Sequence, residues 1–316
     1  MLLYLTRLGS VVPTAAWYSE KHLELSAGPG VNAVGSLPWM INGEYQQHVS
    51  VEDRGLHYGD GLFETFRVNN QVAINRAQHM HRLRVGLKTL QISASSDLIE
   101  RHLNKYLYET NLPPIARLKV IVTRGGPARG YASIQAMPPT VVIGAAPYND
   151  IDESKRIAGV TLRFCSTRLS SNETLAGVKH LNRLEQVLAR SEWQDDTIYE
   201  GLMFDAEESI VEGTMSNLFL VHNTVLTTPT LDRSGVRGVM RGVIMEYIAS
   251  EMGLVVKEQR VSRDDLHSAD EVFISNSLIG ALPVSQCDEF SWLPGPVTQD
   301  IHSAVLQREY SAVRRQ

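Results

Sequence analysis

Cysteine is scarce in this sequence, and long apolar runs are missing. The two cysteines, Cys165 and Cys287, lie far apart and show neither CxxC spacing nor the Cys/His spacing of a zinc site. We therefore expect free, buried thiols in a cytoplasmic protein, because disulfides form in oxidising compartments. No apolar stretch approaches the roughly 20 residues that a membrane-spanning helix needs. Arg7 interrupts the apolar N-terminus and no positive cluster precedes it, so neither export nor a membrane partner is expected.

An excess of positive charge is also missing. The formal net charge is -5 and no run of Lys or Arg occurs, so nucleic acid is not an expected partner. The chain lacks GxGxxG after a strand, GxxxxGK[ST], HExxH and GxSxG, which disfavours the common nucleotide-binding, zinc-protease and serine-hydrolase functions. His79 and His81 form an HxH pair, but residues two apart on a helix point away from each other. No metal site is expected there.

Length and composition are those of a globular protein with two domains. The 316 residues are 43% hydrophobic and 21% charged, a mixture that can bury a substantial core, and typical domain lengths favour two domains. Residues 1–38 show neither helical nor strand periodicity, so we expect a dispensable N-terminal extension, with Met40 as a candidate natural start. A break at Pro147–Asp150 predicts a small α/β domain at 39–148 and a large domain at 149–316.

Local patterns predict a mixture of strands and helices. An apolar strand followed by Asn42-Gly43 predicts a hairpin, because both residues tolerate positive φ. Apolar residues three and four apart predict one helix that begins after Asn75 as its N-cap and a second that begins near Ser96. The other expected elements are strands at 116–125, 140–148, 160–166, 202–207, 209–213, 217–223, 224–229 and 271–277, and helices at 180–193 and 239–253. The fold class is therefore α/β (α+β).

Three charged residues could carry chemistry. Lys179 stands where a loop meets an expected helix, and a buried lysine of lowered pKa could form a Schiff base with a carbonyl compound. Glu212 lies among strands, where a carboxylate between apolar neighbours needs a cationic partner such as a protonated pyridine ring. Arg82 lies on the helix expected after Asn75. Each residue taken alone has a simpler interpretation as an exposed side chain, so no single one identifies a site.

Six segments together resemble one family. They are VEDRGLHYGDGLFETFRV (51–68), HMHRL (79–83), KHLNRLEQ (179–186), IVEGTMSNLF (210–219), SGVRGVMRG (234–242) and FISNSLIGALPV (273–284). In this order they resemble the successive motifs of the class IV aminotransferases, which are pyridoxal 5'-phosphate (PLP) enzymes similar to branched-chain and D-amino-acid aminotransferases. The resemblance implies the two-domain fold of the D-amino-acid aminotransferases, with a smaller N-terminal α/β domain and a larger C-terminal domain that contains a β-barrel-like sheet.

The resemblance implies a site for PLP and a substrate with carboxylates. Lys179 would hold the cofactor covalently, Glu212 would contact its pyridine nitrogen, and Arg82 would contact its phosphate. Further cofactor contacts are implied for Gly238, Val239, Met240, Asn276 and Ser277. The implied substrate-binding residues are Phe63, Arg129 and Tyr131; the last two occupy the place of an Arg-x-His carboxylate trap in the D-amino-acid aminotransferases. In that family this loop reaches the other subunit's site, which implies a homodimer.

Two segments narrow the resemblance further. GVKHLNRLEQVLAR (177–190) and TRGGPARGY (123–131) are similar to aminodeoxychorismate lyases, which implies a PLP-dependent lyase that converts 4-amino-4-deoxychorismate to 4-aminobenzoate and pyruvate. A D-amino-acid or branched-chain aminotransferase of the same fold is the nearest alternative, and a non-catalytic binding protein on this scaffold is the alternative of another class. Residues 1–38 have no counterpart in the family, and the stretch Ser275-Asn276-Ser277 leaves open which side chain meets phosphate.

Overall fold

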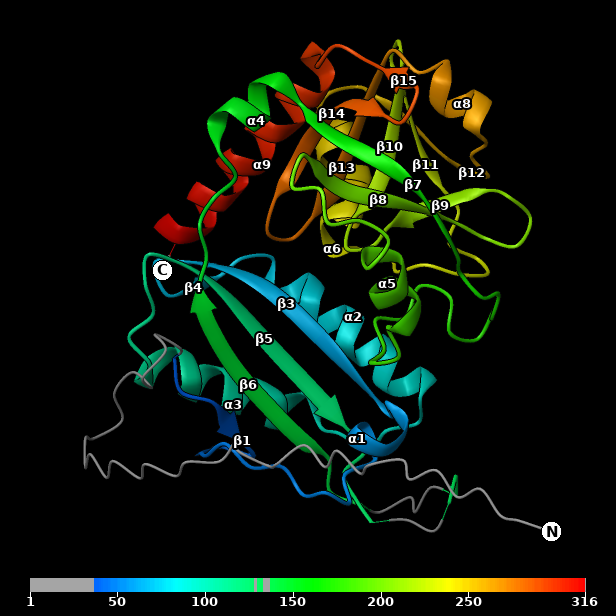
Figure 1. The fold of residues 1–316 in the computed structure, drawn as a ribbon. Coiled ribbons are helices and arrows are strands. Elements are labelled where there is room, and N and C mark those ends of the chain that lie inside the picture. Colours follow the sequence, from blue (N-terminus) through cyan, green and yellow to red (C-terminus); the bar gives the residue numbers. More distant parts are fainter. Residues whose placement is uncertain (1–36, 128–129, 133–136, 316) are drawn as a thin grey trace, which may run out of the picture. The chain divides into compact units, whose positions relative to one another are not determined.

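The computed structural model describes residues 37–127, 130–132 and 137–315, which belong to one compact unit (Figure 1). Its N-terminal part is built on an antiparallel sheet with six described strands in the order β2-β1-β6-β5-β3-β4. These strands are β1 (Met40–Ile41), β2 (Glu44–Tyr45), β3 (Gly61–Asn69), β4 (Val72–Ala73), β5 (Ile115–Thr123) and β6 (Thr140–Pro147). The short helix α1 (Arg54–Tyr58) precedes β3. Asn42 and Gly43 both have positive φ in the turn between β1 and β2, which confirms the predicted hairpin.

Two helices cover one face of this sheet, α2 (Arg76–Thr89) and α3 (Ser96–Glu109) (Figure 1). Both were predicted from apolar spacing, and their inward residues pack against Phe66, Leu118 and Val120 of the sheet. Side chains alternate between the two faces of a strand. Residues an odd number of positions from these core residues on the same strand, such as Phe63 and Lys119, therefore face away from the helices.

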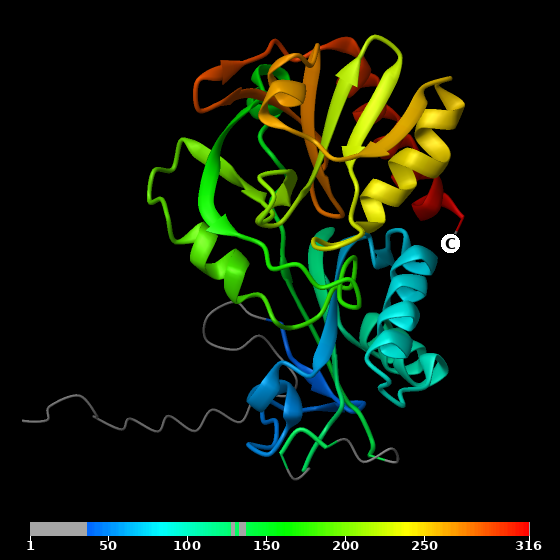
Figure 2. The same ribbon diagram turned by 90° about the vertical axis from the view of Figure 1, so that its right-hand side faces the viewer.

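The C-terminal part is built on a mixed sheet with nine described strands in the order β12-β11-β10-β13-β14-β7-β8-β9, with β15 paired to β14. The strands are β7 (Val160–Arg168), β8 (Ile198–Phe204), β9 (Ile210–Gly213), β10 (Asn217–His222), β11 (Val225–Pro229), β12 (Val255–Gln259), β13 (Glu271–Asn276), β14 (Gly280–Cys287) and β15 (Phe290–Ser291). The sheet curls into a half-barrel (Figure 2). The predicted mixed α/β fold is confirmed, whereas the division into domains at residue 148 stays a prediction.

Helices pack against this second sheet. They are α4 (Glu153–Ala158), α5 (Leu184–Arg190), α6 (Val239–Val243), α7 (Ala249–Glu251), α8 (Arg263–His267) and α9 (Pro296–Arg314), and a π-helical turn at Ile244–Ile248 joins α6 to α7. Residues of α6 and α9, among them Val239, Met240 and Ile301, pack on Phe219 and Phe273 of the sheet. Both cysteines are free and buried, as predicted. Within the described residues, no helix combines the length and the apolar character needed to cross a membrane.

The predicted helix at 180–193 is wrong at its beginning. The helix α5 starts at Leu184, because the preceding residues are extended and pair with the edge of β3. Leu62 and His180 form an antiparallel bridge, and the N–H of Leu181 donates to the carbonyl of Gly61 at 3.0 Å. This pairing depends on a residue more than 100 positions away, so local periodicity could not reveal it.

Residues just before Met40 make specific contacts with the first sheet. The hydroxyl of Tyr106 donates to the carbonyl of Pro38 at 2.8 Å, and Trp39 packs so closely on Gly144 that an added Cβ there would lie 2.3 Å from its ring. Pro38, which the sequence analysis assigns to the extension, therefore contacts the first sheet, while residues 1–36 lie outside the described residues.

Truncation tests this boundary. A protein that begins at Met40 is expected to unfold at a temperature lower by roughly 5 °C or more, because it loses the aromatic packing of Trp39. A protein that begins at Leu37 serves as the matched control and is expected to unfold at the temperature of the full chain in a calorimetric scan. Equal unfolding temperatures for the two truncated proteins would show that Pro38 and Trp39 contribute little.

Candidate active site

Lys179 is held beside the first sheet by backbone pairing. The N–H of Phe63 on β3 donates to the carbonyl of Lys179 at 3.1 Å, and the Lys179 ammonium nitrogen lies 4.2 Å from the centre of the Phe63 ring. Burial, with help from the charge of Arg82, lowers the pKa of Lys179 to about 8, although Glu64 opposes the shift. A lysine with this pKa can exchange a proton near neutral pH.

Glu212 is a buried carboxylate on β9 with one oxygen engaged by the protein. Its Oε2 accepts from the N–H of Val236 at 2.8 Å and from the Asn217 amide at 3.3 Å. Burial raises the pKa of Glu212 to about 7, against the lowering effects of the Val236 N–H and of Arg183. A carboxyl group in this setting would ionise more readily if a cation lay against its second oxygen.

Arg82 projects from α2 and is oriented by Glu64 of β3. Its Nε donates to Glu64 Oε1 at 2.8 Å and its Nη2 to Glu64 Oε2 at 2.5 Å, while its Nη1 donates to the carbonyl of Arg237 at 3.1 Å. Although burial opposes ionisation, the charge and hydrogen bonds of Arg82 hold the pKa of Glu64 at about 2. His79 lies 2.6 Å from the same carboxylate through Nδ1. The sequence analysis missed Glu64, because its role depends on its simultaneous contacts with Arg82 and His79.

The start of α6 and the turn after β13 supply polar groups without a fixed partner. Gly238 is the N-cap of α6, and a side chain there would collide with Asn217, since an added Cβ would lie 2.0 Å from its Oδ1. The first N–H groups of a helix have no partner within the helix, so those of Val239 and Met240 can bind an anion. Ser275 Oγ is buried and has no hydrogen-bond partner among the described residues.

Asn276 differs from its two neighbours because its side chain is already engaged. Its Oδ1 accepts from the N–H groups of Leu278 at 2.9 Å and Ile279 at 3.0 Å, and its amide donates to the carbonyl of Met215 at 3.2 Å. These bonds fix the turn between β13 and β14. Ser275 and Ser277 are therefore the freer hydrogen-bonding side chains of this segment.

One cavity of about 820 Å³ brings most of the predicted residues together. Its lining includes Phe63, Arg82, Lys179, Glu212, Gly238, Val239, Asn276 and Ser277. The Met240 side chain instead packs in the core and lines a smaller cavity, so only its backbone can serve the predicted role.

The cavity wall is strongly cationic. Besides Arg82 and Lys179 it carries Arg117, Lys119, Arg183 and Arg190, and Glu212 is the one acidic side chain that lines it among the described residues. Sequence analysis missed these four cations. Arg117 and Lys119 are two apart on β5, which places both on the face turned away from α2 and α3. This spacing could have predicted that the two cations lie on the same face of the sheet. Such a wall suits a ligand with several negative charges.

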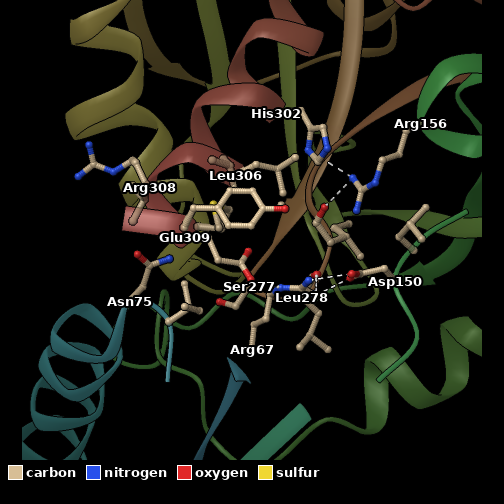
Figure 3. Close-up of a pocket in the computed structure, with 18 of the residues that line it drawn as sticks. Arg67, Asn75, Asp150, Arg156, Ser277, Leu278, His302, Leu306, Arg308 and Glu309 are labelled. Atoms are coloured by element: carbon tan, nitrogen blue, oxygen red, sulfur yellow. Dashed lines mark hydrogen bonds and ion pairs between the residues drawn. The ribbon is translucent and has the colours of Figure 1, made fainter. Parts of the chain in front are cut away.

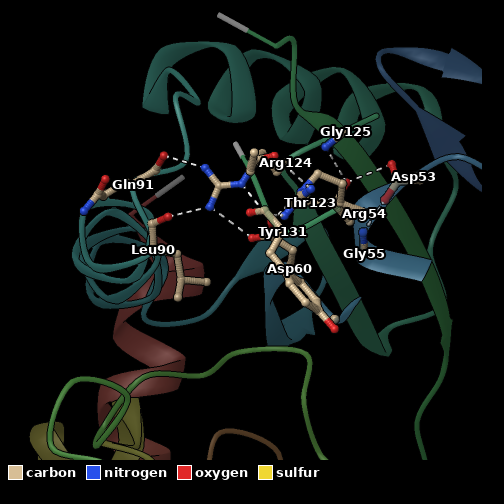
Figure 4. Close-up of polar contacts among 12 residues, drawn as sticks. Asp53, Arg54, Gly55, Asp60, Leu90, Gln91, Thr123, Arg124, Gly125 and Tyr131 are labelled. Carbon is tan, nitrogen blue, oxygen red and sulfur yellow. Dashed lines mark hydrogen bonds and ion pairs between the residues drawn. The ribbon is translucent and has the colours of Figure 1, made fainter. Parts of the chain in front are cut away.

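The loop that carries the remaining predicted residues is anchored by a buried charged cluster (Figure 4). Asp60 accepts from Arg54 and from Arg124 at 2.8 Å each, and Arg54 Nη1 donates to the carbonyl of Gly130 at 2.9 Å. Tyr131 is 86% exposed and does not line the main cavity. Arg129 lies outside the described residues.

Figure 3 shows a smaller cavity of about 220 Å³. Ser277 and Leu278 line both cavities. Behind them Arg67 bonds Asp150 through both Nη groups at 2.6 and 2.9 Å and Glu309 of α9 through Nε at 2.7 Å. Arg67 thus joins β3, the segment after β6 and the last helix next to the turn that borders the main cavity. The described residues contain no cluster of three or more His, Cys, Asp or Glu side chains able to hold a metal ion.

Comparison with known proteins finds one family, whose members include both lyases and aminotransferases. Residues 61–287 match the model of the amino-transferase class IV family. The chain is 35% identical to aminodeoxychorismate lyase from Vibrio harveyi over 78% of this chain and 89% of that protein. The crystal structure of 4-amino-4-deoxychorismate lyase from Pseudomonas aeruginosa superimposes with a TM-score of 0.80 at 39% identity, over 84% of this chain and 97% of that one. A branched-chain-amino-acid aminotransferase from Salmonella typhimurium is 30% identical over 81% of this chain and 86% of that protein.

Proposed function

The chain belongs to the class IV aminotransferase family, and from that premise we propose that it is a PLP-dependent lyase that converts 4-amino-4-deoxychorismate to 4-aminobenzoate and pyruvate. The observation that carries the proposal is that Lys179 and Glu212 line one cavity with a cationic wall. The chain is also similar to two lyases named for this substrate. The product 4-aminobenzoate is a precursor of folate, so the protein acts in folate biosynthesis. Its two free, buried cysteines fit work in the cytoplasm.

The residues of the cavity fit PLP. Its phosphate needs donors, and Arg82, the N–H groups at the start of α6 and the unpartnered Ser275 Oγ supply them. Its pyridine nitrogen needs an anion, and Glu212 is a buried carboxylate whose Oε1 is not used in any described hydrogen bond. Its aldehyde needs an amine that can lose its proton near neutral pH, and Lys179 has such a pKa.

Lys179 performs both proton transfers of the reaction. When bound, PLP withdraws electrons from the substrate ring through its protonated pyridine. The uncharged Lys179 amine would remove the proton from ring carbon C4 of the substrate, and the enolpyruvyl group would leave from C3 as the ring becomes aromatic. The same amine then protonates the departing enol, which becomes pyruvate. A pKa of about 8 allows one group to act as base and as acid.

The cationic wall orients the substrate. A dicarboxylate brings two negative charges into a cavity that also holds a phosphate, and the side chains of Lys119 and Arg117 face that cavity from β5. An aminotransferase of the same fold would use the same lysine but return the proton to the cofactor carbon and release a keto acid. The products formed therefore distinguish the two activities.

Replacing Arg82 by Ala is expected to weaken PLP binding by about 10- to 100-fold, the worth of a charge-assisted hydrogen bond. The dissociation constant is measured by fluorescence titration of the apoprotein. Arg84→Ala is the matched control, because Arg84 lies on the same helix and is exposed, and it should retain normal affinity. Arg82→Lys keeps a positive charge beside the buried Glu64, so the protein should stay folded. A weaker affinity in this variant would then reflect a lost phosphate contact and not a lost fold. Unchanged affinity in both Arg82 variants would contradict the contact.

The protein acts as a homodimer in which Arg129 and Tyr131 of one subunit bind the substrate carboxylate in the site of the other. An exposed apolar strip on α5 supports a subunit contact: Leu184, Val187 and Leu188 are 75%, 57% and 61% exposed. Arg54 and Asp60 anchor the loop, and Tyr131 does not line the subunit's own cavity, which also fits this arrangement.

Subunit exchange tests the shared site. Arg129→Ala is expected to raise KM about 10-fold or more and to leave the bound cofactor unchanged, because a cationic anchor is lost. After mixing with inactive Lys179→Ala protein, hybrid dimers should contain one intact site, so about a quarter of all sites should recover normal KM if subunits pair at random. Steady-state kinetics before and after exchange give the answer. Sites that lie within one subunit would yield no such recovery.

A further inference from the structure

Trp39 lies one residue before β1 and faces the main cavity. Met40 of β1 pairs with Ile143 of β6, so in the same antiparallel register Trp39 comes opposite Gly144. Met40 and Ile143 are buried in the core that the sheet forms with α2 and α3. Because side chains alternate between the two faces of a strand, Trp39 points away from the helices, and it lines the main cavity.

The indole of Trp39 lies flat on the backbone of Gly144. A Cβ added to Gly144 would lie 2.3 Å from Cε3, 2.5 Å from Cζ3 and 2.6 Å from Cδ2 of the indole. Such similar distances place this point over the face of the six-membered ring, because a point beyond the ring edge at Cε3 would be distinctly farther from the other two atoms. Glycine permits this close approach. One face of the indole is therefore covered by the sheet, which leaves the opposite face to the cavity.

A cation stands beside this flat surface. Gly144 is paired with Lys119 of β5, and Lys119 with Thr65 of β3. Residues directly opposite each other in an antiparallel pair point to the same face of the sheet. The indole occupies the place of a side chain at Gly144, so it lies next to Lys119. Trp39, Lys119 and Thr65 thus form one row across the sheet, and all three line the cavity.

A flat apolar surface next to a cation fits a planar ring that bears a carboxylate. The nitrogens of Lys119 and Lys179 lie 5.1 and 4.2 Å from the centre of the same Phe63 ring. In 4-aminobenzoate the amino group and the carboxylate stand at opposite ends of the ring, so an amino end at Lys179 sends the carboxylate toward Lys119. We propose that Trp39 binds the carboxylate-bearing end of the substrate ring, which packs on the free face of the indole while Lys119 pairs with the carboxylate. This assignment rests on the proposed lyase reaction and adds a residue that selects its substrate.

The indole would favour ring substrates over simple amino acids. Stacking of a conjugated ring on an indole raises affinity by about 2- to 12-fold beyond the burial of apolar area, and D-alanine or a branched-chain amino acid has no ring to stack. Trp39 has no role in either proton transfer of the proposed reaction. Its contribution should therefore appear in substrate binding and not in the chemical step.

Kinetics of PLP-loaded variants test this assignment. Trp39→Met keeps an apolar cover over Gly144 but has no flat ring, and it is expected to raise KM for 4-amino-4-deoxychorismate by about 3- to 10-fold with kcat near the wild-type value. Inhibition by 4-aminobenzoate should weaken by a similar factor, whereas inhibition by pyruvate, which has no ring, should not change. Trp39→Phe retains a planar ring and should restore most of the loss. Tyr108→Met is the matched control, because Tyr108 is 92% exposed on α3 and does not line the cavity.

A pair of ring carboxylates tests the stacking without turnover. Calorimetric titration of the PLP-loaded protein with benzoate, which is planar, and with cyclohexanecarboxylate, which is puckered, gives two dissociation constants. The wild type is expected to prefer benzoate by about 3- to 10-fold, and in Trp39→Met the ratio should approach one. A purely structural loss would weaken both ligands equally and leave the ratio unchanged. Gly144→Ala gives a second route, since its methyl group would push the indole off the sheet and should also lower the preference.

The outcomes separate this assignment from the proposed reaction. An unchanged benzoate preference in both Trp39→Met and Gly144→Ala would overturn the role of Trp39. A raised substrate KM with unchanged inhibition by 4-aminobenzoate would also overturn it, because the ring would then lie elsewhere. Absence of 4-aminobenzoate formation by the wild type would count against the lyase reaction alone, since the titration with benzoate uses neither substrate nor turnover.

Discussion

Lys179→Ala is expected to lower turnover by about 10⁴-fold or more and to leave PLP bound without a covalent link. The size of the loss follows from the double use of one amine, since general acid and general base catalysis each contribute about 10²- to 10⁴-fold. Borohydride treatment of the wild-type holoenzyme should fix the cofactor on Lys179, as peptide mapping would show, and the variant should remain unlabelled.

A second lysine provides the control for this experiment. Lys119 lies 5.1 Å from the centre of the same Phe63 ring, compared with 4.2 Å for Lys179. Lys119→Ala should therefore still become labelled at Lys179. Labelling of the Lys179→Ala protein, at Lys119 or elsewhere, would show that another amine holds the cofactor.

Glu212→Gln is expected to lower kcat by about two orders of magnitude, similar to the loss of one preorganised electrostatic group in other active sites. Glutamine keeps the shape of the side chain and its bonds from Val236 and Asn217 can be partly retained, but a neutral amide does not hold a proton on the pyridine nitrogen. The expected signature is a large fall in kcat with a smaller change in KM. Near-normal kcat in this variant would contradict the role of Glu212.

The pH dependence of apoprotein stability gives an independent check on Glu212. Its folded-state pKa of about 7 lies above the ordinary value of 4.5, so between these two pH values the folded state binds more protons than the unfolded state. The contribution of Glu212 to the free energy of unfolding should therefore fall as pH rises from 4.5 to 7 and level off above 7. The Glu212→Gln apoprotein should lack this part of the fall in urea titrations. Identical pH profiles for the two apoproteins would mean that Glu212 is not buried as described.

The parts of the fold predictable from sequence were those with a local cause. The helix α2 follows from apolar residues three and four apart, and the β1–β2 hairpin from Asn42-Gly43, because both signals lie within a few residues. The last helix, α9, was not predicted. Its buried positions include the polar residues Thr298 and Glu309, which bond partners far away in the sequence and weaken the apolar stripe.

The site was predictable only from the order of its motifs. Lys179, Glu212 and Arg82 are ordinary residues in isolation, and their meeting in one cavity depends on pairings that span more than 100 residues. One supporting contact was missed as well: Glu64 of β3 orients Arg82 of α2, and the two meet only once the strand and the helix pack together.

The central claim is that this cavity eliminates pyruvate from an aminated chorismate rather than transferring an amino group. The most direct test incubates the PLP-loaded protein with 4-amino-4-deoxychorismate and quantifies both products, with D-alanine or branched-chain amino acids plus a keto-acid acceptor as the competing assay. The account predicts 4-aminobenzoate and pyruvate in equal amounts, and little keto acid from the amino acids. Efficient amino transfer without 4-aminobenzoate would contradict it.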